Sequence, residues 1–100
     1  MEVFEALADP TRRKIVELLA SRERSAGELA GHFRVTRPAV SRHLRVLREA
    51  GVVSARGDAQ KRIYRLEPDA LGRAEGWLAR HREFWQGRLD ALEEHVRREE

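Results

Sequence analysis

The spacing of apolar residues changes twice along this chain of 100 residues, and the changes restrict the folds that it can adopt. In the first half, apolar residues recur at three- and four-residue steps, which is typical of amphipathic helices. Residues 52–56 and 62–66 instead alternate around a turn at 57–60 and predict a two-stranded hairpin. Over residues 68–96 the helical spacing returns. These patterns predict a mostly α-helical fold in which one β-hairpin separates four short helices from a long final helix.

Capping signals predict where three of the short helices begin. Asp9 suits the N-cap of the second helix, with Pro10 at its first position, and the first helix ends before them because the residue preceding a proline avoids helical geometry. Ser25 and Glu28 have the spacing of a capping box at the start of the third helix. Thr36 can cap the fourth helix.

The fourth predicted helix, over residues 36–47, has two chemically different faces. Val40, Leu44 and Leu47 recur at i, i+4 and i+7, so they line one side that we expect to be buried. On the other side or its flank lie Arg37, Ser41, Arg42 and Arg45. A helix that is apolar inward and rich in arginine outward can lie in a DNA groove while its back packs on a small core.

Positive charge is concentrated in the middle of the chain. Residues 34–65 contain nine basic and two acidic residues, a net charge of +7, whereas the whole chain carries +3 and the remainder therefore −4. A basic middle between mildly acidic ends indicates a surface for a polyanion, although a solvated arginine-rich face would have the same composition.

The composition argues against several other classes of protein. Because the chain has no cysteine, it forms neither disulfides nor thiolate metal sites, which fits a reducing cytoplasm. No segment approaches the roughly 18 consecutive apolar residues of a transmembrane helix, and the acidic start at residues 1–5 lacks the basic region of a secretory signal. We expect a cytoplasmic protein with no membrane partner, in which residues 1–100 form a single domain.

The last predicted helix carries an apolar stripe that one small domain cannot cover. Over residues 68–96 it would run roughly 40 Å at ~1.5 Å per residue, which exceeds the usual diameter of so small a domain. Its aromatic residues predict the interface of a symmetric homodimer formed by residues 1–8 and 68–98; the alternative is that they close the monomer's own core. The predicted interface residues are Phe4, Leu7, Leu71, Trp77, Leu78, Phe84, Trp85, Leu89 and Leu92.

Four spaced motifs carry a resemblance to a known family. They are Leu7–Ile15, Pro38–Leu47, Glu49–Val53 and Tyr64–Leu66. In this order, and over about residues 3–67, they resemble the ArsR family of bacterial transcriptional repressors. The tail, with Phe84 and Trp85 followed by residues 88–92, is similar to the metal-independent, autorepressor-like members of that family.

The resemblance implies a winged helix-turn-helix fold, in which residues 36–47 form the recognition helix and the hairpin forms the wing. It also implies a homodimer built from the first and last helices. Each recognition helix would lie in a major groove of a palindromic operator in double-stranded DNA, and binding would block transcription.

Many members of the family release DNA when a metal or metalloid binds, and this sequence departs from them. Arsenic-type sensors have thiolates at the start of the third helix, where this chain has residues 25–29 without cysteine. Zinc-type sensors use carboxylates and imidazoles along the last helix, where this chain offers His81, Glu83 and His95. The two histidines are too far apart for one site in a single chain, so we predict ordinary surface residues, no metal site and no cofactor. A site shared across the dimer is the alternative.

The polar residues of the fourth helix and of the wing are the candidates for contacting DNA. Arg37 and Arg42 can bridge O6 and N7 of guanine, or they contact phosphates only. Ser41 donates to DNA or to its own helix, His43 donates to a phosphate or packs beside the second helix, and Arg45 neutralises phosphate. The predicted contacts are Thr36, Arg37, Ala39, Ser41, Arg42, His43 and Arg45 of the helix, with Arg56, Lys61 and Arg62 of the wing.

Two alternatives come from other functional classes. In an enzyme, Ser41 and His43 would be the nearest nucleophile and base, but two positions apart on a helix their side chains diverge by about 200° and cannot pair. The sequence also has no glycine-rich phosphate loop, so we predict that the protein is not an enzyme. The second alternative is a winged-helix module that binds only proteins, in which the basic strip would be incidental.

Overall fold

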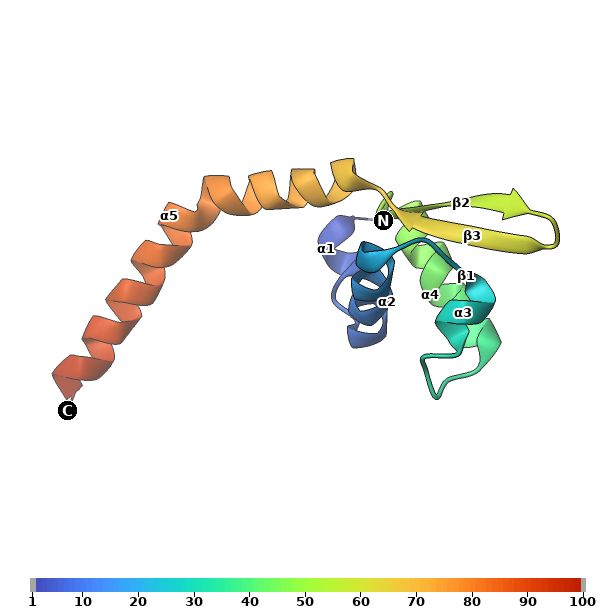
Figure 1. Cartoon of the computed structure of the whole chain (residues 1–100). Helices are drawn as coiled ribbons and strands as arrows, with labels where there is room; N and C mark the ends of the chain where they lie inside the picture. Colours follow the sequence, from blue (N-terminus) through green and yellow to red (C-terminus); the bar gives the residue numbers. More distant parts are fainter. Residues whose placement is uncertain (1, 100) are drawn as a thin grey trace.

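The computed structural model describes residues 2–99, apart from the side chains of Glu83, Trp85 and Glu99 (Figure 1). The first seven elements pack together, whereas the last helix leads away from them, so that the molecule measures 63 × 29 × 23 Å. In chain order the elements are α1 (Val3–Ala6), α2 (Pro10–Ser21), β1 (Arg24–Ser25), α3 (Ala26–Ala30), α4 (Arg37–Glu49), β2 (Val53–Asp58), β3 (Lys61–Leu66) and α5 (Pro68–Glu99).

The predicted N-caps form in the structure. Asp9 accepts hydrogen bonds from two backbone N–H groups of α2 at 2.8 and 3.1 Å. Ser25 and Glu28 exchange both bonds of the capping box, at 3.1 and 3.3 Å. Thr36 accepts a bond of 3.2 Å from the third residue of α4. Each cap satisfies N–H groups that the helix leaves without partners, which is worth about 1 kcal/mol per cap, and together the caps fix where α2, α3 and α4 begin.

The apolar stripes of the helices meet in one core. Ile15 of α2, Leu29 of α3, and the predicted inner face of α4 are almost completely shielded from solvent. Val52, just before β2, is also fully buried, and its N–H donates to the carbonyl of Leu47 at 2.9 Å. Because such side chains each contribute roughly 1.5–3 kcal/mol when buried, they hold α4 in one orientation about its axis.

The sheet has one strand more than the sequence analysis predicts. β1, only two residues long, pairs antiparallel with β3, so the strand order is β1-β3-β2. The alternating pattern cannot reveal a strand of two residues, and Ser25 combines this strand position with the capping of α3. The chain between α2 and α3 is thereby attached to the wing.

The hairpin is also longer than predicted. β2 continues to Asp58 and β3 begins at Lys61, and these two residues pair with each other, which leaves only Ala59 and Gln60 in the turn. Ala59 adopts a positive φ of 57°, a conformation that tight hairpin turns require and that residues with a Cβ adopt at some cost. The prediction ended the strands early because Gly57 and Asp58 are typical turn residues.

The last helix, α5, has 32 residues and spans about 48 Å at ~1.5 Å per residue. Its first turns contact α1, and Ala70 is fully buried. Beyond these turns the helix runs away from the core and bends, so that its C-terminal half lies far from the other elements (Figure 1). Among the described residues, no helix combines the length and the apolar character that crossing a bilayer would require.

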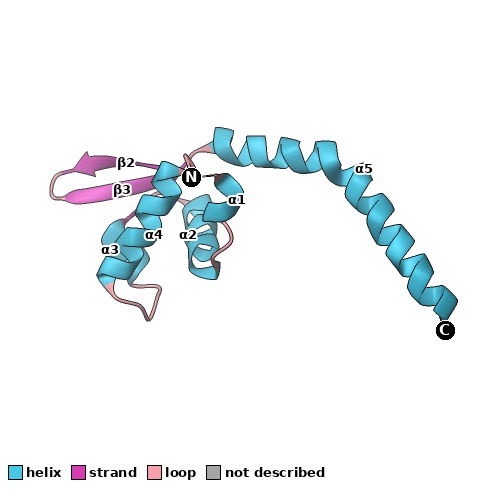
Figure 2. Cartoon of the chain, turned by 180° about the vertical axis from the view of Figure 1, so that it is seen from behind, coloured by secondary structure: helices cyan, strands magenta, loops and turns pink. Residues whose placement is uncertain are grey.

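Together these elements form a winged helix-turn-helix. α3 and α4 supply the helix-turn-helix, and β2 with β3 supplies the wing, as the sequence predicts. Figure 2 shows that the wing and α5 extend from opposite sides of the helical core.

Candidate nucleic-acid interface

The surface of α4 carries the polar residues that the sequence analysis singled out. Because Val40, Leu44 and Leu47 are at most 1% exposed, the opposite side of the helix must face solvent. Ala39 and His43 lie half-buried on its flank. Exposed on the outer side, or at the cap, are Thr36, Arg37, Ser41, Arg42 and Arg45. One helix therefore brings seven of the predicted contact residues together.

The arginines of this surface keep their charge available. In the part of the chain that the structure describes, Arg37, Arg42 and Arg45 form no ion pair. The guanidinium of Arg37 extends towards α3, where a Cβ added to Gly27 would lie 3.5 Å from its Nη2 atom. An unpaired, exposed guanidinium can neutralise a phosphate or bridge the major-groove edge of a guanine.

The basic residues of the wing divide into two kinds. Arg56 pairs with Glu23, which precedes β1, at 2.7 Å, so the extra strand and the wing are joined by an ion pair as well as by the sheet. Lys61 and Arg62, next to the turn, are exposed and form no ion pair within residues 2–98. The wing tip is thus the part with free positive charge.

His43 contacts a neighbouring helix through one of its two ring nitrogens. Its Nδ1 atom lies 3.3 Å from Nη1 of Arg12, in the first turn of α2. The same arginine donates to the carbonyl oxygens of Ala6 at 2.5 Å and Glu5 at 3.2 Å, at the end of α1. Arg12 therefore joins α1, α2 and α4. Arg12 is not among the contact residues predicted from the sequence, although it lies within the motif at residues 7–15.

The carboxylates of Asp9 and Glu28, at the starts of α2 and α3, are stabilised in their charged form. Burial works against the ionisation of Asp9, but the backbone N–H of Arg12, the electrostatic attraction of His43 and the backbone N–H of Thr11 outweigh it and hold the pKa of Asp9 below its ordinary value. The side chain of Arg22, with the backbone N–H of Ser25, lowers the pKa of Glu28. Both carboxylates cap helices, so their charge belongs to the scaffold that positions α4.

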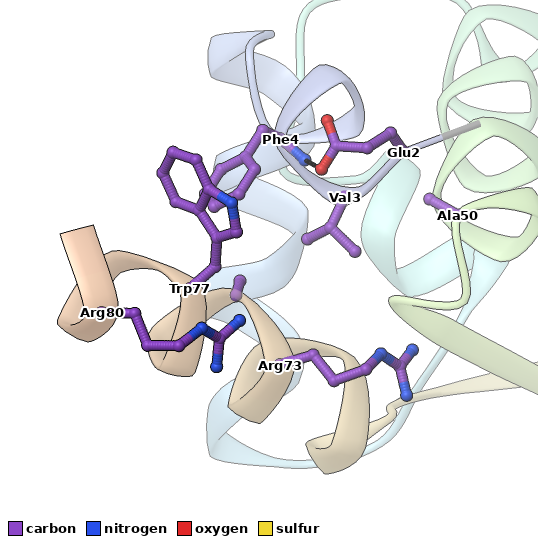
Figure 3. Close-up of a pocket in the computed structure, with 8 residues that line it drawn as sticks. Glu2, Val3, Phe4, Ala50, Arg73, Trp77 and Arg80 are labelled. Carbon is purple, nitrogen blue, oxygen red and sulfur yellow. Dashed lines mark hydrogen bonds between the residues drawn. The ribbon is translucent and has the colours of Figure 1, made fainter.

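The predicted interface residues fall into two groups. Leu7 and Leu71 are half-buried and pack against the core of the same chain. The ring of Phe4 meets that of Trp77 edge-on, with centroids 5.3 Å apart, beside a pocket between α1 and α5 that Arg73 also lines (Figure 3). This contact fixes the first turns of α5 against α1.

The outer part of α5 has no core to cover it. Leu78, Phe84, Leu89 and Leu92 are 50–60% exposed. The side chain of Trp85, which the sequence analysis also assigned to the interface, lies outside the described part. The structure therefore packs Leu7 and Leu71 against the core. Phe4 and Trp77 contact each other but remain more than one third exposed, and the outer residues face solvent.

The histidines of α5 do not gather with other ligands. Where side chains are described, no group of three or more His, Cys, Asp or Glu residues could hold a metal ion. The ring of His81 stacks on Trp77 with centroids 4.2 Å apart, and its Nδ1 atom lies 2.8 Å from the Trp77 carbonyl oxygen. His81 thus has a structural contact within its own helix.

Comparisons with known proteins agree on one family. The sequence model described as "Bacterial regulatory protein, arsR family" matches residues 9–55. The transcriptional repressor SdpR of Bacillus subtilis (strain 168) is 40% identical over 76 residues, which are 76% of this chain and 84% of that protein. The chain belongs to the ArsR family. It is accordingly a DNA-binding transcriptional regulator, and the family is not enzymatic.

Solved structures of similar proteins share the fold of this ArsR-family regulator. A crystal structure described as a "possible transcriptional regulator for arsenical resistance" has a TM-score of 0.80 and 43% identity, and the match covers 92% of this chain and 93% of that one. The solution structure of the homodimeric winged helix-turn-helix DNA-binding domain of Mb0332 from Mycobacterium bovis has a TM-score of 0.66 and 29% identity, with 80% and 77% covered. The predicted fold class is confirmed.

Proposed function

We propose that this ArsR-family regulator is a homodimeric repressor that acts in the cytoplasm and binds a palindromic operator. In each subunit α4 enters a major groove, and the tip of the wing contacts the adjacent backbone. The single observation that carries the proposal is the surface of α4. Its apolar face is buried, Arg42 and Arg45 are exposed on the opposite side, and Arg37 is exposed in the first turn; within the described residues no carboxylate pairs with any of the three.

The roles of the individual residues follow from their surroundings. Arg37 and Arg42, which are exposed on α4 and form no ion pair within the described residues, are the two that we assign to base contacts, because a guanidinium can bridge O6 and N7 of guanine. Arg45, Lys61 and Arg62 neutralise phosphates. The remaining contacts are Thr36, Ala39, Ser41 and His43, with Arg56 held against Glu23 at the edge of the wing.

A dimer formed by residues 1–8 and 68–98 accounts for the length of α5. A row of leucines exposed to solvent along one helix is costly, and burying each against a second copy would recover roughly 25 cal/mol per Å² of apolar surface. The Mb0332 domain, which is similar to this chain, is homodimeric. The two-fold axis of such a dimer would place the operator half-sites about one helical turn apart, ~10 bp centre to centre.

We further propose that this regulator does not require a metal and belongs with the autorepressor-like members of the family. The sequence has no cysteine, so the thiolate chemistry of arsenic-type sensors is absent from it. The second candidate is a metal-responsive repressor with a His and carboxylate site shared across the dimer, and the name of the similar protein linked to arsenical resistance gives it weight.

A footprint on the gene's own upstream DNA tests both proposals. We expect the purified protein to protect two half-sites related by a two-fold axis, and to protect them equally with zinc, with arsenite and with neither added. If the purified protein is a folded dimer but gives neither protection nor a gel shift at low salt, the proposal that it is a repressor is refuted. Loss of protection on adding zinc or arsenite would instead establish the metal-responsive alternative.

A further inference from the structure

The contact between Arg12 and His43 restricts which ring nitrogen of His43 can carry hydrogen while the two side chains are bonded. A guanidinium has five N–H donors and no acceptor, and it stays protonated in proteins. Since Nη1 of Arg12 lies 3.3 Å from Nδ1 of His43, the hydrogen bond forms only if Nδ1 accepts. The imidazole is then neutral, and its hydrogen lies on Nε2.

Arg12 is held in place by bonds other than the one to His43. Its Nε and Nη2 atoms donate to the carbonyl oxygens of Ala6 and Glu5, which belong to α1. Its backbone N–H donates to the carboxylate of Asp9 at 3.1 Å. The guanidinium therefore reaches His43 from a fixed position, and it is the partner that sets the tautomer.

The Nε2 atom of His43 points to a place that solvent reaches. No hydrogen bond to it occurs among the described residues, and the described part contains no buried side-chain nitrogen or oxygen atom that lacks a partner. Because His43 itself is only half-buried, its Nε2–H is an unused donor at the edge of the α4 surface.

We propose that Arg12 is a positioning residue that holds His43 in the Nε2–H tautomer, and that this N–H donates to a phosphate oxygen of the operator. The second half of the proposal rests on the DNA-binding function proposed above. His43 then differs from the arginines around it, because it offers a directed hydrogen bond without a positive charge. The sequence left two interpretations of His43 open, packing beside α2 and donating to phosphate. In this proposal both hold, because Nδ1 contacts Arg12 of α2 and Nε2–H donates to the phosphate.

The tautomer is tested on the free protein, without DNA. A long-range ¹⁵N–¹H spectrum of the imidazoles, recorded above neutral pH, is expected to show a protonated Nε2 and an unprotonated Nδ1 for His43. Arg12→Met should convert this to a mixture of tautomers, and Arg12→Lys, which keeps a charged donor, should retain part of the preference. A wild-type spectrum with hydrogen on Nδ1, or with mixed tautomers, would overturn the role of Arg12.

Arg13 supplies the matched control. It is the next residue of α2 and also donates to carbonyl oxygens before the helix, those of Leu7 at 3.0 Å and Ala8 at 3.1 Å, but it does not bond to His43. Arg13→Met is therefore expected to leave the His43 spectrum as in the wild type. An equal loss of tautomer preference in the Arg12 and Arg13 variants would mean that the effect is a general loosening of α1.

The phosphate contact is tested by two amides that imitate different ring nitrogens. The amide N–H of glutamine reaches the position of Nε2, whereas that of asparagine reaches only the position of Nδ1. His43→Gln should bind the operator within about threefold of the wild type, and His43→Asn should bind about 10- to 100-fold more weakly, the range of one lost hydrogen bond to a charged acceptor. The dependence of affinity on salt should not change, since a neutral donor releases no counterion.

Equal affinities of the Gln and Asn variants, or a flatter salt dependence in either, would refute the phosphate contact. If the wild-type protein bound no DNA at all, the proposed function would fail, while the spectrum of the free protein would still decide the tautomer. The two failures are thus separate.

Discussion

Two helices of this molecule, α4 and the outer part of α5, are both amphipathic, but only α4 finds a core within its own chain. The apolar face of α4 is shielded by α2, α3 and the segment before β2. The leucines along the outer part of α5 are at least half exposed. The chain therefore fixes the orientation of α4 by itself, whereas in the proposed homodimer the distance between two copies of α4 would be set by the outer part of α5.

Removing a side chain from the α4 core should have the largest effect. Leu44→Ala creates a cavity beneath the surface that we propose contacts DNA, and we expect a loss of about 2–5 kcal/mol in the free energy of unfolding. Denaturant titration of the wild type and the variant measures this loss. A change below 1 kcal/mol would show that the core behind α4 is not what holds it.

Removing leucines from α5 should weaken association and leave each subunit folded. For Leu89→Ala with Leu92→Ala we expect the dimer to dissociate at micromolar concentration and operator affinity to fall by about 100-fold, because two linked half-site contacts become single ones. Light scattering and gel shift measure the two effects. Glu94→Ala with Arg98→Ala, an exposed pair on the opposite side of the helix, is the matched control and should change neither.

Removing the cap of α2 should cost less and should depend on pH. Asp9→Ala is expected to destabilise the protein by about 1 kcal/mol at neutral pH. Because the folded state lowers the pKa of Asp9, its contribution is complete above the ordinary aspartate pKa and is lost as the pH falls through the lower, folded-state value. Denaturant titrations between neutral and strongly acidic pH should show the two proteins converging only below about pH 4. A difference that stays constant across this range would contradict the assignment.

The smallest expected effects distinguish the two kinds of basic residue in the wing. Arg62→Ala should weaken binding to every DNA sequence and lower the slope of log affinity against log salt by about one. Arg56→Ala should change the slope by less, because Arg56 is already paired with Glu23 at 2.7 Å. Affinities measured at several salt concentrations compare them, and a slope unchanged by the Arg62 variant would remove that residue from the interface.

The helix starts and the buried face of α4 can be predicted from local sequence signals. Asp9, Ser25 and Thr36 cap helices as their residue types predict, and the spacing of Val40, Leu44 and Leu47 identifies the buried face of α4. Such features depend on residues within one or two turns of each other, so a reading of the chain can find them.

The features that the sequence did not reveal depend on contacts between distant segments. β1 has two residues and exists because β3 lies beside it. The bond from Arg12 to His43 joins residues 31 positions apart, and no pattern within either helix predicts it.

The sequence alone determined the elements, their caps, the inner and outer faces of α4 and the concentration of positive charge, because these depend on residue type and on periodicity along one helix or strand. Only the tertiary structure decided that a third strand joins the wing, that Arg56 is paired whereas Arg62 has no ion pair among the described residues, and which nitrogen of His43 meets Arg12. These outcomes depend on which side chains meet across the core, and that is set by packing of the whole chain.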